Sequence, residues 1–157
     1  MAEIALAKAL KVKNRLTGRL AKVQADIQTY NSVPEGQVDQ VNVLALMKTR
    51  EEVVGALVSL KTAINDANRE VQRDIYDLAE KKAAAQFLAG INTRHGPQPP
   101  VFSSTVEVIY VAALKKADMD ALMVRLENEI DQLQDWLDQF NHVHRIEVDG
   151  RTLELAS

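Results

Sequence analysis

Two histidines near the end of the chain, His142 and His144, have a spacing that fits metal binding. Residues two apart share one face of a β-strand, so both imidazoles could reach the same ion. No third ligand follows on that face, because Glu147 falls on the opposite side of such a strand. We therefore favour two half-exposed imidazoles without a metal, and keep a small metal-dependent hydrolase as the alternative.

A third histidine, His95, follows Arg94 in a segment, residues 93–104, that holds three of the four prolines. Proline restricts the backbone to extended or turned conformations, so this segment is predicted to be a loop. His95 and Arg94 together could bind an anion. A histidine on a surface loop is the interpretation that we favour.

Carboxylates recur three and four residues apart in the last third of the chain, a spacing that places them on one face of a helix. This acidic stripe consists of Glu127, Asp131, Asp135 and Asp138. Carboxylates at this spacing can hold a hard cation, and the hydrolase alternative would depend on them. A solvated helix face is the more common role of such a stripe.

A basic stripe of the same kind runs through the first thirty residues and consists of Lys8, Lys11, Arg15 and Lys22. It could contact phosphate backbones. Nucleic acid is nevertheless not expected as a partner, because only 4% of the residues are aromatic and the net charge is −3. Isolated surface ion pairs contribute only about 0–1 kcal/mol each. We therefore expect the two stripes to select helix partners, within one chain or between chains.

The sequence lacks the motifs of the common enzyme classes. The 157 residues include no cysteine, which excludes disulfides, thiolate zinc sites and cysteine nucleophiles. Glycine-rich phosphate loops, the strained serine turn of the α/β-hydrolases and the zinc motif His-Glu-x-x-His are also missing. We predict no catalytic residues and no cofactor.

Charged residues also bear on location. Glu3, Lys8 and Lys11 interrupt the first residues, so no signal-peptide core is expected. We expect no membrane span, because the chain has no run of about 18 apolar residues. These features predict a cytoplasmic protein, with membrane association of an amphipathic helix as a further alternative.

Four segments carry apolar residues alternately three and four apart, the heptad pattern of packed helices. The first two, residues 3–31 and a helix starting at the N-cap Asp39, are separated by a turn containing Pro34 and Gly36. They predict an antiparallel hairpin. A break near residues 64–68 precedes a third helix, 69–91. A fourth follows the N-cap Asp118, so that the helical parts are 3–92 and 118–141.

The remaining residues predict a small β part, 105–112 and 143–155. Residues 105–111 are β-branched and aromatic, which is typical of a strand. Asp149-Gly150 separates two alternating runs, the pattern of a β-hairpin. We therefore predict a single domain, 1–157, of the mainly α (α+β) class. It would be an elongated bundle of about four helices with a small antiparallel sheet.

Several short motifs, in this order, resemble the septicolysin-type family of uncharacterised bacterial helical proteins. They are Ala7–Leu10, Asn14–Leu20, Val33–Gly36, Ile64–Asn68, Glu107–Tyr110, Asp118–Leu122 and the stretch from Ile130 to Asn141. The resemblance covers most of the chain through about Val148 and implies an α-rich fold. The chain departs from the family pattern at His142, where tryptophan is expected, in lacking a glycine turn after the second helix, and in the added Asp149-Gly150.

We predict a non-enzymatic structural or protein-interaction module that self-associates, or binds a protein partner, through its helical seams. Burial of apolar stripes, at about 25 cal/mol per Å², would drive this association. The sequence leaves open whether the seam residues form an interface between chains or an intrachain core. The residues chosen are Leu126, Ile130, Leu133 and Leu137, with Leu16, Leu20 and Leu57 facing them.

Overall fold

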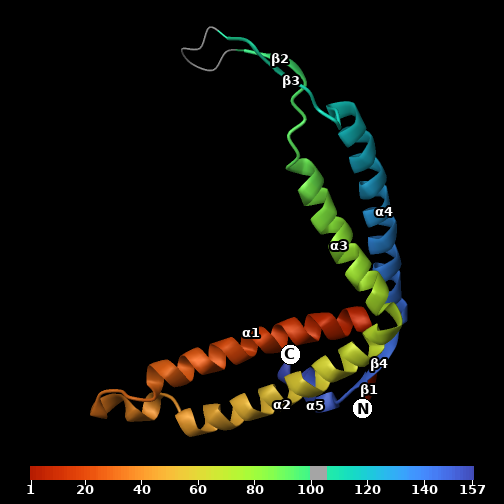
Figure 1. Cartoon of the computed structure of the whole chain (residues 1–157). Coiled ribbons are helices and arrows are strands. Elements are labelled where there is room, and N and C mark those ends of the chain that lie inside the picture. The colour runs from red at the N-terminus through yellow and green to blue at the C-terminus, as the bar shows by residue number, and fades with distance from the viewer. Residues whose placement is uncertain (100–105) are drawn as a thin grey trace. The chain divides into compact units, whose positions relative to one another are not determined.

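The computed structural model describes residues 1–99 and 106–157 of the chain. Helices dominate these residues, and the strands among them form two small antiparallel sheets (Figure 1). The predicted class, mainly α with a small β part, is therefore confirmed. The chain divides into two compact units, which we describe separately as unit 1, Met1–Glu70 with Asp138–Ser157, and unit 2, Val71–Leu137.

Unit 1 is built on an antiparallel hairpin of two long helices, α1 (Leu6–Tyr30) and α2 (Val43–Asn68), which lie side by side (Figure 1). The heptad spacing turns one apolar stripe of each helix toward the other. Their buried side chains form the core of this unit, together with residues from the two ends of the chain. The helical members are Leu6, Ala9, Val12, Leu16, Val53, Leu57, Leu60, Ile64 and Ala67.

The predicted N-cap of the second helix is wrong. Asp39 lies within a 3₁₀ turn, Glu35–Gln40, and the chain is extended again at Val41 before α2 begins. The helix is capped by Asn42, whose Oδ1 accepts a hydrogen bond from the Ala45 backbone N–H at 3.0 Å. Asparagine and aspartate are comparable caps, so local preference alone did not separate the two positions.

The first residues of the chain form a strand, β1 (Ala2–Ala5), where a helix was predicted from residue 3. This strand pairs antiparallel with β4 (Arg145–Val148), and Ile4 lies opposite Ile146 with both side chains buried. The Leu6 backbone N–H donates to the His144 carbonyl at 2.9 Å, which ties the start of α1 to the same strand. The N-terminal residues thus complete the core rather than extend the helix.

The predicted C-terminal hairpin, residues 143–155, is also wrong. After β4 the chain forms a short helix, α5 (Gly150–Leu155), instead of a second strand. Asp149 is its N-cap, and its Oδ1 accepts a hydrogen bond from the Arg151 N–H at 3.0 Å. Because β4 takes its partner from the N-terminal segment, the Asp-Gly pair serves as a helix start instead of a hairpin turn.

The register of β1 and β4 places two carboxylates, Glu3 and Glu147, directly opposite each other on the exposed face. Like charges at this separation destabilise a strand pair. We expect Glu147→Lys to raise the free energy of unfolding by about 0.5 kcal/mol, because an attractive pair replaces a repulsive one. Urea denaturation measures this change, and Glu147→Gln, the neutral control, should give a smaller gain. A loss of stability in the lysine variant would contradict the register.

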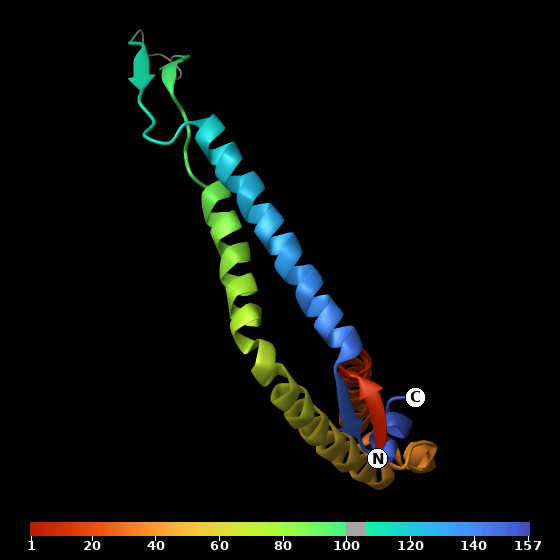
Figure 2. The same cartoon turned by 90° about the vertical axis from the view of Figure 1, so that its right-hand side faces the viewer.

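Unit 2 contains α3 (Gln72–Ala89), which follows a 3₁₀ turn at Arg69–Val71, and most of α4 (Lys116–Val143). The two helices run antiparallel and side by side in both views (Figures 1 and 2). Polar side chains join them: Lys81 Nζ lies 2.8 Å from Glu129 Oε2, and the Trp136 indole N–H donates to Asp74 Oδ2 at 3.1 Å. The break predicted near residues 64–68 falls at Asn68.

The start of α4 differs from the prediction. Asp118 lies inside the helix, and its Oδ2 accepts a hydrogen bond from the Lys115 backbone N–H at 3.1 Å. A side chain in the first turn that reaches back in this way occupies the acidic position of a capping box. Asp118 therefore stabilises the start of the helix from within its first turn, three residues after Lys115, and is not the N-cap itself.

A two-stranded ribbon precedes α4 and consists of β2 (Gly96–Gln98) and β3 (Val108–Tyr110). The strand predicted over residues 105–111 is thus present in its central part, and its first residue lies outside the described residues. Part of the predicted loop, 93–104, forms β2, while residues 100–104 also lie outside the described residues. The prediction of one sheet is wrong, because β3 pairs with β2 and β4 pairs with β1.

Candidate functional site

The two C-terminal histidines do not share a strand face. His142 lies in the last turn of α4, and its Nδ1 is 2.7 Å from the Asp138 carbonyl oxygen, to which it donates. The ring of His144 stacks on Phe140 with centroids 4.8 Å apart. Among residues 1–99 and 106–157, no group of three or more histidines and carboxylates could hold a metal ion. The geometry thus offers the hydrolase alternative no site in this part of the chain.

His95 and Arg94 are engaged with the β2–β3 ribbon. His95 Nδ1 accepts a hydrogen bond from the Ala112 backbone N–H at 3.2 Å. The guanidinium carbon of Arg94 lies 5.9 Å from the centre of the Tyr110 ring, a cation–π distance. These contacts hold the base of the ribbon, so both residues have a structural role as the structure places them.

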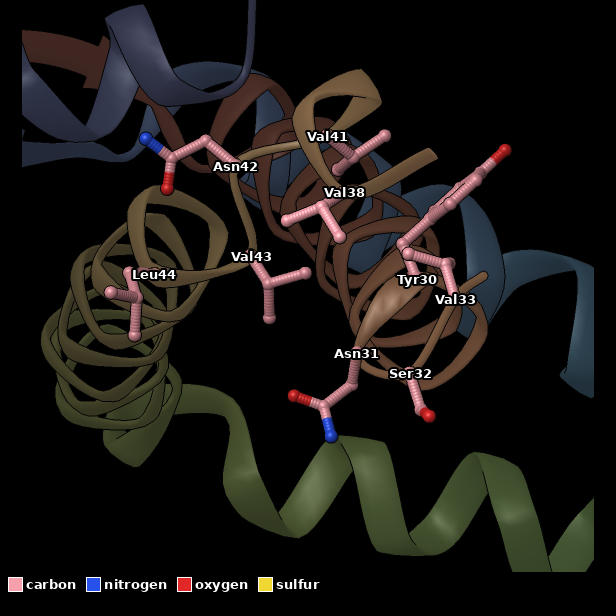
Figure 3. Close-up of a pocket in the computed structure, with 9 residues that line it drawn as sticks. All are labelled: Tyr30, Asn31, Ser32, Val33, Val38, Val41, Asn42, Val43 and Leu44. Carbon is pink, nitrogen blue, oxygen red and sulfur yellow. The ribbon is translucent and has the colours of Figure 1, made fainter. Parts of the chain in front are cut away.

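A hollow of about 580 Å³ lies where the chain passes from α1 to α2 (Figure 3). Val38 and Val43 point into the same space, and the amides of Asn31 and Asn42 lie at its edge (Figure 3). Among the side chains that the structure describes, its lining includes the Tyr30 phenol but no carboxylate, histidine, lysine or arginine. The hollow can therefore accept apolar groups, and the charged side chains of most catalytic sites are not among these lining residues.

A second hollow, about 550 Å³, lies between α1, α2 and α5, and we call it the basic groove. Arg15, Arg19 and Lys22 line it from successive turns of α1, and Leu46 and Thr49 line it from α2. The Arg19 Nη1 donates to the Leu155 carbonyl oxygen at 2.7 Å. Arg19 is therefore held in place, whereas Arg15 and Lys22 are exposed.

Two exposed ion pairs have shifted pKa values. The hydrogen bond from Arg151 lowers the pKa of the Glu52 carboxyl, and the same bond raises the pKa of Arg151. In unit 2, the hydrogen bond between Lys81 and Glu129 lowers the pKa of the carboxyl and raises that of the ammonium. Each pair joins two helices, α2 with α5 and α3 with α4, so its role is structural.

The predicted seam residues fall into two groups. Leu16 and Leu57 are buried in the core of unit 1, and Leu20 packs against that core. The α4 group belongs to unit 2, where Leu137 is buried and the others are half-buried: Leu126, Ile130 and Leu133. The structure thus brings the first group together in an intrachain core and leaves the second partly uncovered.

Both charged stripes are exposed. The ion pairs of the described residues include neither Arg15 nor Lys22 of the basic stripe, and neither Glu127 nor Asp131 of the acidic stripe. Sequence reasoning missed Arg19, because its partner Leu155 lies 136 residues away and leaves no local signal.

The chain matches no known family model, no curated protein and no solved structure. The resemblance to septicolysin-type proteins therefore stays a prediction. Within the described residues, none of the helices combines the length and the apolar character needed to cross a membrane.

Proposed function

We propose that this protein is a non-enzymatic structural or interaction protein that self-associates through the apolar seam of α4. The partly covered seam is the observation that carries the proposal. Leu126, Ile130 and Leu133 are half-buried, although they occupy the spacing at which a helix buries its apolar stripe. A second chain packed on this seam would remove the remaining apolar surface from water.

The small core of unit 2 supports the same proposal. Among the described residues of this unit, four apolar side chains are buried: Val71, Leu78, Met119 and Leu137. In unit 1, by contrast, α1 contributes core residues from Leu6 to Leu16 and α2 contributes them from Val53 to Ala67. Because few apolar side chains are buried in the described part of unit 2, a second chain that covers its apolar face would stabilise it.

The test replaces two seam residues by a small polar one, Leu126→Ser together with Ile130→Ser. Size-exclusion chromatography with light scattering gives the mass of each species at tens of micromolar. We expect the unchanged chain to run as an oligomer and the double variant to shift to the monomer, because the apolar contact is lost. Circular dichroism checks that the variant keeps its helices.

Gln132→Ser is the matched control, because Gln132 lies exposed on the opposite side of the same helix. This variant should associate as the unchanged chain does. A monomeric unchanged chain at tens of micromolar would refute the proposed function. Equal association of the seam variant and the control would show that another surface joins the chains.

A further inference from the structure

The basic groove of unit 1 concentrates positive charge that no carboxylate of the described residues neutralises in an ion pair. Arg15, Arg19 and Lys22 line it, and the Leu155 carbonyl fixes Arg19 at its rim. Glu52, whose pKa Arg19 also helps to lower, is bonded to Arg151 instead. Of the described side chains that line the groove, three are cationic and one, that of Asp26, is a carboxylate.

The acidic face of α4 in unit 2 has the opposite charge. We define it as Glu127, Asp131 and Asp135, which are exposed and lie on successive turns. Glu129 points elsewhere on the helix and is paired with Lys81. Val124 lies three residues before Glu127 on the same face, and its side chain is 58% exposed. The face therefore combines three carboxylates with an apolar side chain.

The two surfaces also agree in length. The helix rises about 10 Å from Arg15 to Lys22 and about 12 Å from Glu127 to Asp135, at about 1.5 Å per residue. Three charges of each sign are thus spread over about two turns. The groove wall contributed by Leu46 suits an apolar side chain such as Val124. Complementary charges of this kind select a partner and set its register.

We propose that the basic groove is the docking site for the acidic face of α4 from a second copy of the chain. This inference rests on the proposed self-association and adds a second contact, between the basic groove and the acidic face, to the contact through the seam. Each copy carries one groove and one acidic face, so the same contact repeats between copies and can close a symmetric assembly.

The test reverses charge on each surface separately. The groove variant is Arg15→Glu with Lys22→Glu, which leaves the Arg19 contact intact. The face variant is Glu127→Lys with Asp131→Lys. We expect each variant alone to associate roughly tenfold more weakly than the unchanged chain, because like charges now meet. Sedimentation velocity at tens of micromolar in low salt measures the dissociation constants.

Mixing the two variants is the decisive step. The reversed groove of one chain is complementary to the reversed face of the other, and the second contact between them joins two unchanged surfaces. We therefore expect the equimolar mixture to associate as the unchanged chain does. Lys61→Glu with Lys115→Glu is the control for the groove variant, since it changes the net charge by the same amount and in the same direction at exposed positions outside both surfaces.

Two outcomes would overturn the inference. If either variant alone associates as the unchanged chain does, the groove and the face do not meet, although association through the seam would still hold. If both variants are weakened but the mixture is not restored, each surface has a different partner, and binding of inorganic phosphate to the groove would identify an anion site. A monomeric unchanged chain would refute the proposed function itself and this inference with it.

Discussion

Leu16→Ala is expected to lower the free energy of unfolding by about 3 kcal/mol. Leu16 is 0% exposed in the α1–α2 core, where Val53 and Leu60 are also fully buried. Truncation removes apolar contact and leaves a cavity that two long rigid helices cannot easily close. Urea denaturation followed by circular dichroism at 222 nm measures the loss, since the hairpin contributes much of the helical signal.

Leu44→Ala is the matched control for this change. Leu44 lies in the first turn of α2 and is 83% exposed, so the same truncation should change the free energy of unfolding by less than about 0.5 kcal/mol. The comparison isolates burial, because both substitutions remove the same atoms from a helix. Equal effects at the two positions would contradict the packing of α1 on α2.

Leu155→Asp should release α5 from unit 1 and cost about 3 kcal/mol of stability. Leu155 is 5% exposed, and burying an unpaired carboxylate there is unfavourable in either protonation state. A helix of six residues does not persist in water without tertiary contacts. Hydrogen exchange of the amides in residues 150–157 should accelerate in the variant, even under conditions where α1 and α2 stay folded.

Glu154→Asp provides the control for this second change. It places the same side chain one residue earlier, at an exposed position of the same helix. We expect near-normal exchange and stability from this variant. Slow exchange of residues 150–157 in the Leu155→Asp variant would mean that α5 is held by its capping bond and ion pairs alone.

The helices were predicted well because their signal is local and repeated. The heptad spacing of apolar residues marks a helix by the geometry of its own turns, whatever it packs against. That is why the mainly α class and the α1–α2 hairpin were confirmed. Helix starts were predicted less well. Aspartate and asparagine have similar preferences for the N-cap position, so the choice of Asn42 over Asp39 depends on the path of the preceding turn.

The β elements were predicted poorly because strand pairing depends on residues far apart in the sequence. Ala2–Ala5 forms a strand because it pairs with Arg145–Val148, and the sequence of the first residues gives no indication of that partner. Because β4 pairs with β1, no second strand follows Asp149-Gly150, and these residues begin α5 instead. His142 likewise lies on a helix, so the metal pairing drawn from strand geometry has no basis.

The two candidate surfaces, the basic groove and the acidic face, were also predictable only in part. Their charges could be predicted from the sequence alone, since the spacing of Arg15 and Lys22, and of Glu127 and Asp131, places each pair on one helix face. The groove itself depends on the fold, because it forms where α5 packs on α2 and its Leu155 carbonyl accepts a hydrogen bond from Arg19 of α1.

The helices, their apolar stripes and the sign of charge along each helix follow from residues close together in the sequence, so they could be predicted without the fold. The tertiary structure alone decided which stripes are covered within the chain. Leu16 and Leu57 are buried in the core between α1 and α2, while Leu126, Ile130 and Leu133 are half-buried. Burial requires a second element to pack on the stripe, and a periodic pattern in one helix does not specify which element that is.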